Sequence, residues 1–144
     1  MTTEARSVSA HPSRRLVVVA ALAAGAVVAI AANTLVALAA IGAGASGAFA
    51  PLTIPVYSAF TIIGLVAGYI GWRLVRARSV APRRVLSILV PVVLVLSFIP
   101  DSIAMIVEFI PGGSVTGYVG LMIMHLVVVA VGVPIFARLA PAAR

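Results

Sequence analysis

The fold is decided by residues 73–84, which read RLVRARSVAPRR. This segment carries half of the ten arginines in a chain of 144 residues, and an apolar run lies on each side of it. A short basic segment between two such runs is typical of a loop on the cytoplasmic side of a membrane. It therefore predicts that one helix leaves the membrane here and that the next one enters it. The arginines of this segment are Arg73, Arg76, Arg78, Arg83 and Arg84.

Four apolar runs make up most of the rest of the chain. Each reaches the roughly 20 residues that a helix needs to cross the hydrocarbon core of a bilayer. The strands of a membrane barrel would be about 10 residues long with alternating polarity, and the sequence has no such alternation. We therefore predict an all-α membrane protein, a four-transmembrane-helix bundle within residues 14–144, preceded by a disordered polar tail at residues 1–13. The predicted spans are residues 16–41, 54–75, 85–110 and 117–137.

The composition argues against several other classes of protein. Hydrophobic residues make up 63% of the chain and charged residues only 9%, whereas about a quarter of a typical soluble domain is charged. The net charge of +7 would suit a nucleic-acid-binding protein, but the arginines flank the apolar runs. Membrane topology therefore explains them without nucleic acid. Because the chain has no cysteine, it has no disulfides and no thiolate metal site.

The arginines also predict the orientation of the bundle. The connections at residues 42–53 and 111–115 carry no charge. A four-span chain then has every arginine on one side, which the positive-inside rule assigns to the cytoplasm. We expect a multi-pass protein of the inner (plasma) membrane with both termini in the cytoplasm, and the arginines of residues 73–84 could contact anionic lipid or a cytoplasmic partner. The arginines outside that segment are Arg6, Arg14, Arg15, Arg138 and Arg144.

The start of the first span admits a second interpretation. The sequence SRRLVVVAALAAG at residues 13–25 resembles a twin-arginine export signal, and AFA at residues 48–50 resembles a cleavage site. The apolar run is about 26 residues long, however, whereas the apolar part of a signal peptide has about 7–15 residues. The sequence therefore favours a first transmembrane helix that is retained.

Small residues recur at helical spacing in the first two spans. Such rows let the backbones of membrane helices approach closely. They favour packing within the bundle, and a homo-oligomer is the alternative. The residues are Ala21, Gly25 and Ala29 in the first span and Gly64, Gly68 and Gly71 in the second.

Two of the three acidic residues lie in FIPDSIAMIVEFIPGG, residues 98–113, at the end of the third span. The third and fourth spans form an antiparallel hairpin that brings Asp101 level with His125, and Glu108 level with Tyr118. Asp101 and Glu108 are seven residues apart, so we expect them on one face of the third helix.

The polar side chains of the other spans gather in the same half of the bundle, the outer one. Asn33 lies there on the first span, and Tyr57 and Thr61 lie near the start of the second. We therefore predict an intramembrane polar cluster of Asn33, Asp101 and His125.

Three interpretations of Asp101 and His125 remain open. An ionisable side chain within a membrane is costly and should find a partner. The two side chains could form a protonatable site open to the outer face, with coupled titration, or a polar contact that fixes the register of the third and fourth spans. If they do not meet, Asp101 could cap a short helix after Pro100. Glu108 is expected to be a surface carboxylate, and Asn33 to form a hydrogen bond between helices.

The sequence gives little support to an enzyme. A catalytic zinc site needs three protein ligands and an open position, and Asp101, Glu108 and His125 lack the close spacing of a metal-binding motif. No glycine-rich phosphate loop precedes a lysine, and no serine lies in a nucleophile motif. We expect a structural or partner-binding membrane protein without a cofactor, in a homo-oligomer or a larger membrane complex. The alternative is a small proton- or cation-linked transporter or channel that uses Asp101 and His125.

Several short motifs resemble those of a known group of proteins. They are the basic N-terminal tail, the R-x-R sequence at Arg76–Arg78, the Pro100–Asp101 pair, and MHLVVVAVGVPIFAR at Met124–Arg138. In these the chain resembles small four-helix membrane proteins of unknown function from high-GC Gram-positive bacteria, over most of its length after residue 14. The resemblance implies a membrane location and four spans, and it implies no activity and no site.

Overall fold

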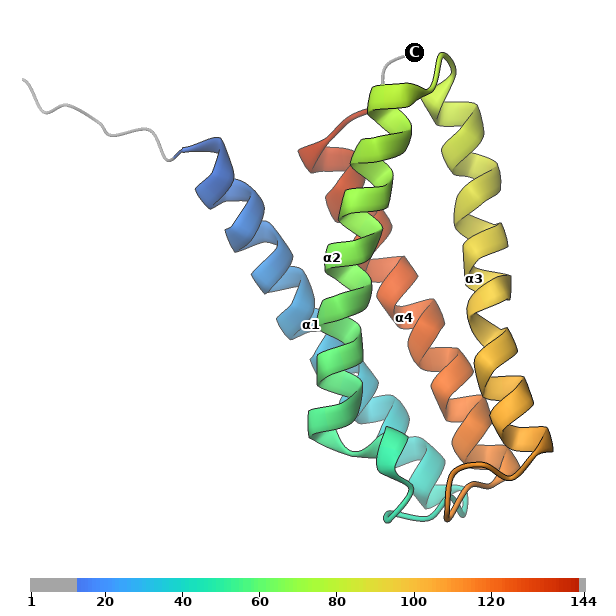
Figure 1. Cartoon of the computed structure of the whole chain (residues 1–144). Helices are drawn as coiled ribbons and strands as arrows, with labels where there is room; N and C mark the ends of the chain where they lie inside the picture. The colour runs from blue at the N-terminus through green and yellow to red at the C-terminus, as the bar shows by residue number, and fades with distance from the viewer. Residues whose placement is uncertain (1–12, 143–144) are drawn as a thin grey trace, which may run out of the picture.

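The computed structural model describes residues 13–142, which form four α-helices and one short 3-10 helix (Figure 1). Each α-helix is long and apolar enough to cross a membrane, which confirms the prediction of an all-α chain with four such helices. The predicted disordered tail lies, except for Ser13, outside the described residues. The elements in chain order are α1 (Arg14–Gly42), η1 (Ala50–Leu52), α2 (Ile54–Arg78), α3 (Pro82–Ile106) and α4 (Val115–Leu139).

Successive α-helices run in opposite directions, so the bundle has two ends (Figure 1). We call one the arginine end; it comprises the start of α1, the connection between α2 and α3, and the end of α4. The other, the distal end, comprises the α1–α2 and α3–α4 connections. Every arginine within residues 13–142 lies within five residues of a helix terminus at the arginine end. These arginines are Arg14, Arg15, Arg73, Arg76, Arg78, Arg83, Arg84 and Arg138.

Serines and prolines explain where the helices begin. The side chains of Ser13 and Ser114 each accept a hydrogen bond from the backbone N–H three residues further on, at 3.4 and 3.2 Å. These bonds satisfy N–H groups that have no partner within the first helical turn. Pro55 and Pro82 lie in the first turns of α2 and α3, where the helix does not need their missing N–H groups.

Helix α4 is central to the packing, because it contacts all three other α-helices and makes the two most extensive contacts of the bundle, with α1 and with α3. Its most extensive contact is with α1, on which every fourth residue from Gly25 to Ala37 is buried. A Cβ added at Gly25 would lie 2.5 Å from the Ile135 side chain of α4, and one at Gly68 of α2 would lie 3.0 Å from Phe136 of α4. These small residues therefore serve packing within the bundle.

A buried phenylalanine in the α1–α2 connection closes the distal end. Phe49 has 0% of its surface exposed, and its ring meets that of Tyr118 edge-on, with the ring centroids 5.1 Å apart. Gly117 makes room for it, since a Cβ added there would lie 3.0 Å from the Phe49 ring. The uncharged connection at residues 42–53, which the sequence predicts only as a link between spans, therefore contributes to the core.

The third helix ends before the predicted span does. Helix α3 ends at Ile106, and the N–H of Val107 donates a capping hydrogen bond to the Ile103 carbonyl at 3.0 Å. Glu108 then adopts a positive φ of 50°, which lies outside the helical region. The prediction that Asp101 and Glu108 share a helix face is therefore wrong, because the chain leaves the helix between them.

Candidate functional site

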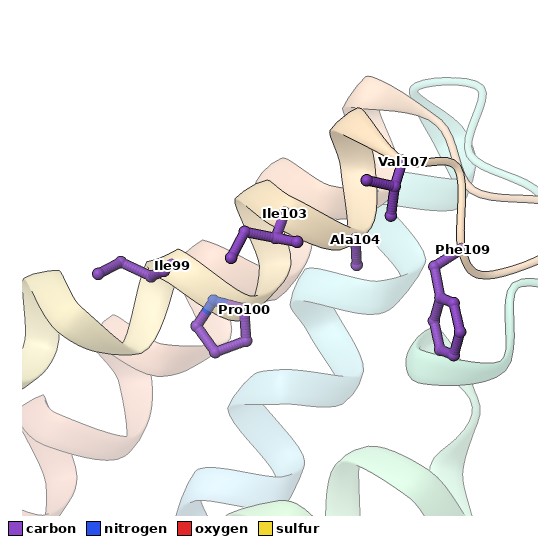
Figure 2. A pocket seen from close by; sticks show the side chains of 6 residues that line it. All are labelled: Ile99, Pro100, Ile103, Ala104, Val107 and Phe109. Atoms are coloured by element: carbon purple, nitrogen blue, oxygen red, sulfur yellow. The ribbon is translucent and has the colours of Figure 1, made fainter.

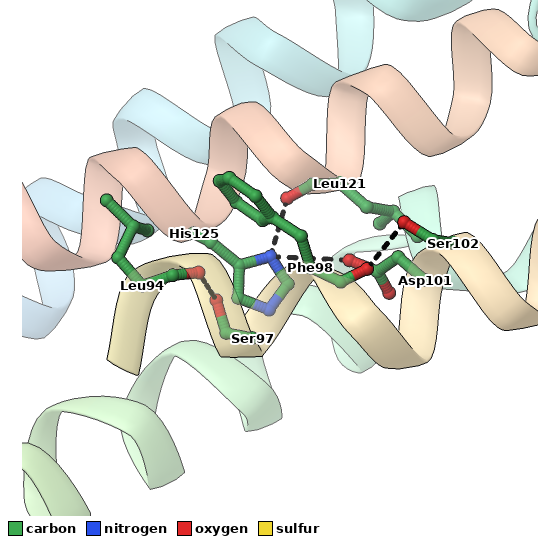
Figure 3. Close-up of polar contacts among 7 residues, drawn as sticks. All are labelled: Leu94, Ser97, Phe98, Asp101, Ser102, Leu121 and His125. Carbon is green, nitrogen blue, oxygen red and sulfur yellow. Dashed lines mark hydrogen bonds and ion pairs between the residues drawn. The ribbon is translucent and has the colours of Figure 1, made fainter. Parts of the chain in front are cut away.

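Asp101 and His125 meet at the seam between α3 and α4 (Figure 3). The Nδ1 atom of His125 lies 3.5 Å from Oδ2 of Asp101. Asp101 is five residues from the end of α3 and His125 is ten residues from the start of α4, so both lie nearer the distal end. An antiparallel hairpin places these two positions at the same depth, and the contact agrees with that argument from the sequence.

The His125 ring has a hydrogen-bond partner, whereas one carboxylate oxygen of Asp101 has none among the described residues. His125 Nδ1 lies 2.9 Å from the Leu121 carbonyl oxygen, one turn earlier on α4. Because a carbonyl oxygen only accepts, Nδ1 carries the proton in this contact. The 3.5 Å contact to Asp101 is then electrostatic, and Oδ2 of Asp101 is buried without a hydrogen-bond partner among the described residues. This carboxylate oxygen can therefore accept one more hydrogen bond.

The seam encloses the two side chains only in part. The His125 side chain is 38% exposed and the Asp101 side chain 18%. The Phe98 ring packs edge-on against the imidazole, with the ring centroids 6.0 Å apart. Ser97 and Ser102 lie nearby, but their hydroxyls donate to carbonyls of their own helix at 2.6 and 2.9 Å (Figure 3). Neither serine hydroxyl hydrogen therefore supplies the missing donor to Asp101.

Asn33 belongs to a different contact, between α1 and α2. Its Nδ2 donates to the Thr61 hydroxyl at 2.9 Å, and the two residues are 0% and 2% exposed. At the next residue of α1, the Thr34 hydroxyl donates to the Ile30 carbonyl and so accepts from the Tyr57 hydroxyl at 2.8 Å. The predicted trio is thus divided into an α1–α2 clasp around Asn33 and an α3–α4 pair of Asp101 and His125. The sequence identified the helix and depth of Thr61 and Tyr57 but not their partners.

Cysteines at positions 101 and 125 are expected to cross-link efficiently, because their side chains face each other across one seam. The chain has no native cysteine, so the double variant Asp101→Cys/His125→Cys reports this contact alone. A disulfide needs Cα atoms within about 7 Å, and a short bifunctional thiol reagent covers a longer reach. The measurement is the cross-linked fraction in native membranes, with Glu108→Cys/His125→Cys as the matched control. A control pair that links as well as the 101/125 pair would contradict the seam geometry.

The arginines of residues 73–84 lie at the opposite end of the bundle from the described carboxylates. Within residues 13–142 the acidic side chains are Asp101 and Glu108, and both lie toward the distal end. The arginine end therefore has no acidic side chain of its own in the part of the chain that the structure describes.

Two grooves run along α3. The distal groove, of about 410 Å³, is lined by apolar side chains of the last turns of α3 and by Phe109 (Figure 2). The inner groove, of about 480 Å³, lies at the arginine end between α2, α3 and α4. Its lining includes Trp72 and Arg83. Only the inner groove combines apolar walls with a positive charge.

The chemistry available at these sites is limited. No three His, Asp or Glu side chains lie close enough to hold a metal ion among residues 13–142. The Asp101–His125 pair can hold a proton, accept a hydrogen bond at Oδ2, and present part of an imidazole outside the seam. These properties suit polar recognition or proton exchange.

Comparison with known proteins identifies a family. A model described as a family of unknown function (DUF6069) matches residues 11–142. No curated protein and no solved structure matches the chain. Because the match spans nearly the whole sequence, the chain belongs to the DUF6069 family of unknown function.

Proposed function

We propose that the protein crosses the inner (plasma) membrane four times with both ends in the cytoplasm. Four helices of sufficient length and apolar character support the insertion. The gathering of the described arginines at one end supports the orientation, because positive residues remain on the cytoplasmic side. The distal end, with the Asp101–His125 pair nearby, then faces outward.

Within the membrane, the protein binds another membrane helix along the α3–α4 seam. One observation carries this proposal: the ionisable pair of Asp101 and His125 is only partly enclosed by the bundle, with 38% of the His125 side chain exposed. His125 is about 15 Å along α4 from its distal end, at 1.5 Å per residue. A partly exposed imidazole is costly in lipid, so a polar group of a partner helix is expected to cover the exposed part of His125.

The packing of α3 supports the same role. Across Pro82–Ile106, all of which the structure describes, Leu86 is the one buried residue. Helix α3 contacts α4 and, less extensively, α2. Its remaining surface is therefore free to pack against another protein. The partner is a second copy of this chain or a subunit of a larger membrane complex.

The double variant Asp101→Leu/His125→Leu is expected to lose the partner while keeping its helices. A polar contact between membrane helices is worth about 1–2 kcal/mol, so loss of the pair weakens the affinity for the partner about tenfold. The measurement is the mass of particles extracted with their native lipid, together with mixed-tag pull-down to detect a second copy. Leu35→Ala/Leu38→Ala, at exposed positions of α1, is the matched control. If both variants keep the wild-type mass, the seam is not the binding surface.

A small proton- or cation-linked transporter is the second candidate. The 3.5 Å approach of His125 to Asp101 favours it, because two coupled ionisable groups can pass a proton. Proton flux into vesicles that contain the purified protein alone, abolished by Asp101→Asn, would support this activity. Partner binding without such flux would support the first proposal.

A further inference from the structure

The inner groove lies at the arginine end, where α3 and α4 diverge beside α2 (Figure 1). In Figure 1, α3 and α4 lie side by side near the distal end and diverge toward the arginine end. The space between them is lined by Trp72 of α2, by the first turns of α3, and by the last turns of α4. Its volume of about 480 Å³ falls within the range of roughly 300–1,000 Å³ typical of small-ligand sites.

The walls of the inner groove are apolar and its mouth is positive. Leu86, Val90 and Val133 supply aliphatic side chains along its length. Arg83 lines it at the first turn of α3 and is exposed. A helix start also favours a nearby anion, because the positive end of the helix dipole lies there. A ligand for this site should therefore have a long apolar part and an anionic head.

The polar atoms inside the groove are already engaged. Trp72 Nε1 donates to the Ala140 carbonyl at 2.9 Å, which fixes the indole against the end of α4. The Ser87 hydroxyl donates to the Arg84 carbonyl at 2.9 Å. The interior therefore offers apolar contact and no free donor from these two side chains, while the guanidinium of Arg83 remains at the mouth. This arrangement suits a hydrocarbon chain better than a polar metabolite.

We propose that the inner groove binds one anionic phospholipid, with an acyl chain between α3 and α4 and the phosphate on Arg83. The proposal rests on the membrane insertion proposed above, which brings the arginine end to the headgroups of the inner leaflet. It goes beyond general attraction of lipids to basic loops, because it assigns one arginine and one groove. The distal groove serves as an internal contrast, since its lining carries no charge.

The protein carries its own reporter for this site. Trp72 is the one tryptophan of the chain and lines the inner groove. In phosphatidylcholine vesicles that contain a small fraction of lipid with brominated acyl chains, bromine near the indole quenches its fluorescence. Brominated phosphatidylglycerol is expected to quench more strongly than the same fraction of brominated phosphatidylcholine. Arg83→Gln is expected to lower this preference about fivefold, since an arginine near the surface contributes about 1 kcal/mol of attraction.

Matched variants distinguish lipid binding in the inner groove from the general attraction of anionic lipid by positive charge. Arg78→Gln removes the same charge from an exposed arginine that does not line the groove, and it should keep most of the preference. Ala137→Phe, which narrows the groove, should reduce quenching by both brominated lipids. Equal quenching by the two lipids, or equal losses in Arg78→Gln and Arg83→Gln, would overturn the proposal. Failure of membrane insertion itself would be seen separately, as protein that does not float with the vesicles.

Discussion

Asn33→Asp is expected to destabilise the folded bundle strongly. Asn33 has 0% of its surface exposed, and the one hydrogen bond of its side chain in the structure is donated by Nδ2 to the Thr61 hydroxyl at 2.9 Å. Aspartate has nearly the same shape but brings a negative charge, for which the Thr61 hydroxyl offers one donor. An uncompensated buried charge destabilises a protein by about 3–5 kcal/mol, a large share of the roughly 5–15 kcal/mol by which a folded protein is stable. The measurement is unfolding in detergent, followed by circular dichroism.

Two further variants isolate the cause. Asn33→Leu removes the polar groups and keeps most of the volume, and the Thr61 hydroxyl can then donate to a carbonyl of its own helix. Its expected loss is about 1 kcal/mol, the scale of one polar contact between membrane helices. Gly47→Asp places the same charge in the exposed α1–α2 connection and should leave stability unchanged. If Asn33→Asp unfolds like Gly47→Asp, water reaches position 33 and the α1–α2 clasp is not buried.

The sequence was sufficient for the number of helices and for the depth of their polar residues. An apolar run of about 20 residues has few alternatives to a helix, so the four helices follow directly. Depth also follows from connectivity, because a hairpin fixes which positions of α3 and α4 are level. This is why the sequence pairs Asp101 with His125, whereas the helix face that it predicts for Asp101 and Glu108 together is wrong because α3 ends between them. Exposed apolar residues beyond the helix end, such as Phe109 at 78%, extend the run and hide where α3 stops.

Rotation about the helix axes was harder to predict. In a soluble bundle polar residues mark the outer face, but here most faces are apolar and the contrast is weak. The sequence therefore does not identify the partner of Asn33, and it groups Asn33 with Asp101 and His125 by depth alone. A signal was present nonetheless, because Asn33 continues the four-residue row of Gly25 and Ala29 that packs against other helices. Cytoplasmic orientation of the arginine end remains a prediction.

Phe49→Ala is the second substitution with a large expected effect, and we expect it to lower the free energy of unfolding by about 3–5 kcal/mol. The Phe49 ring is fully buried, packs edge-on against Tyr118, and occupies the space that Gly117 leaves open. Removing it creates a cavity where the α1–α2 connection meets α4, and the small neighbours cannot fill that space. Phe49→Leu, which keeps part of the volume, should show a smaller loss. Thermal or denaturant unfolding in detergent measures both.

Phe60→Ala is the matched control, because it removes the same atoms from a side chain of α2 that is 69% exposed. A surface substitution of this kind changes stability by about 0.5 kcal/mol or less. Equal losses at positions 49 and 60 would mean that stability depends on total apolar surface and not on the packing of the connection. A large loss at position 49 alone would instead establish that residues 42–53 hold α1 and α4 together at the distal end. The length of this connection would then be constrained by packing, and an insertion beside Phe49 should destabilise the bundle as much as removal of its ring.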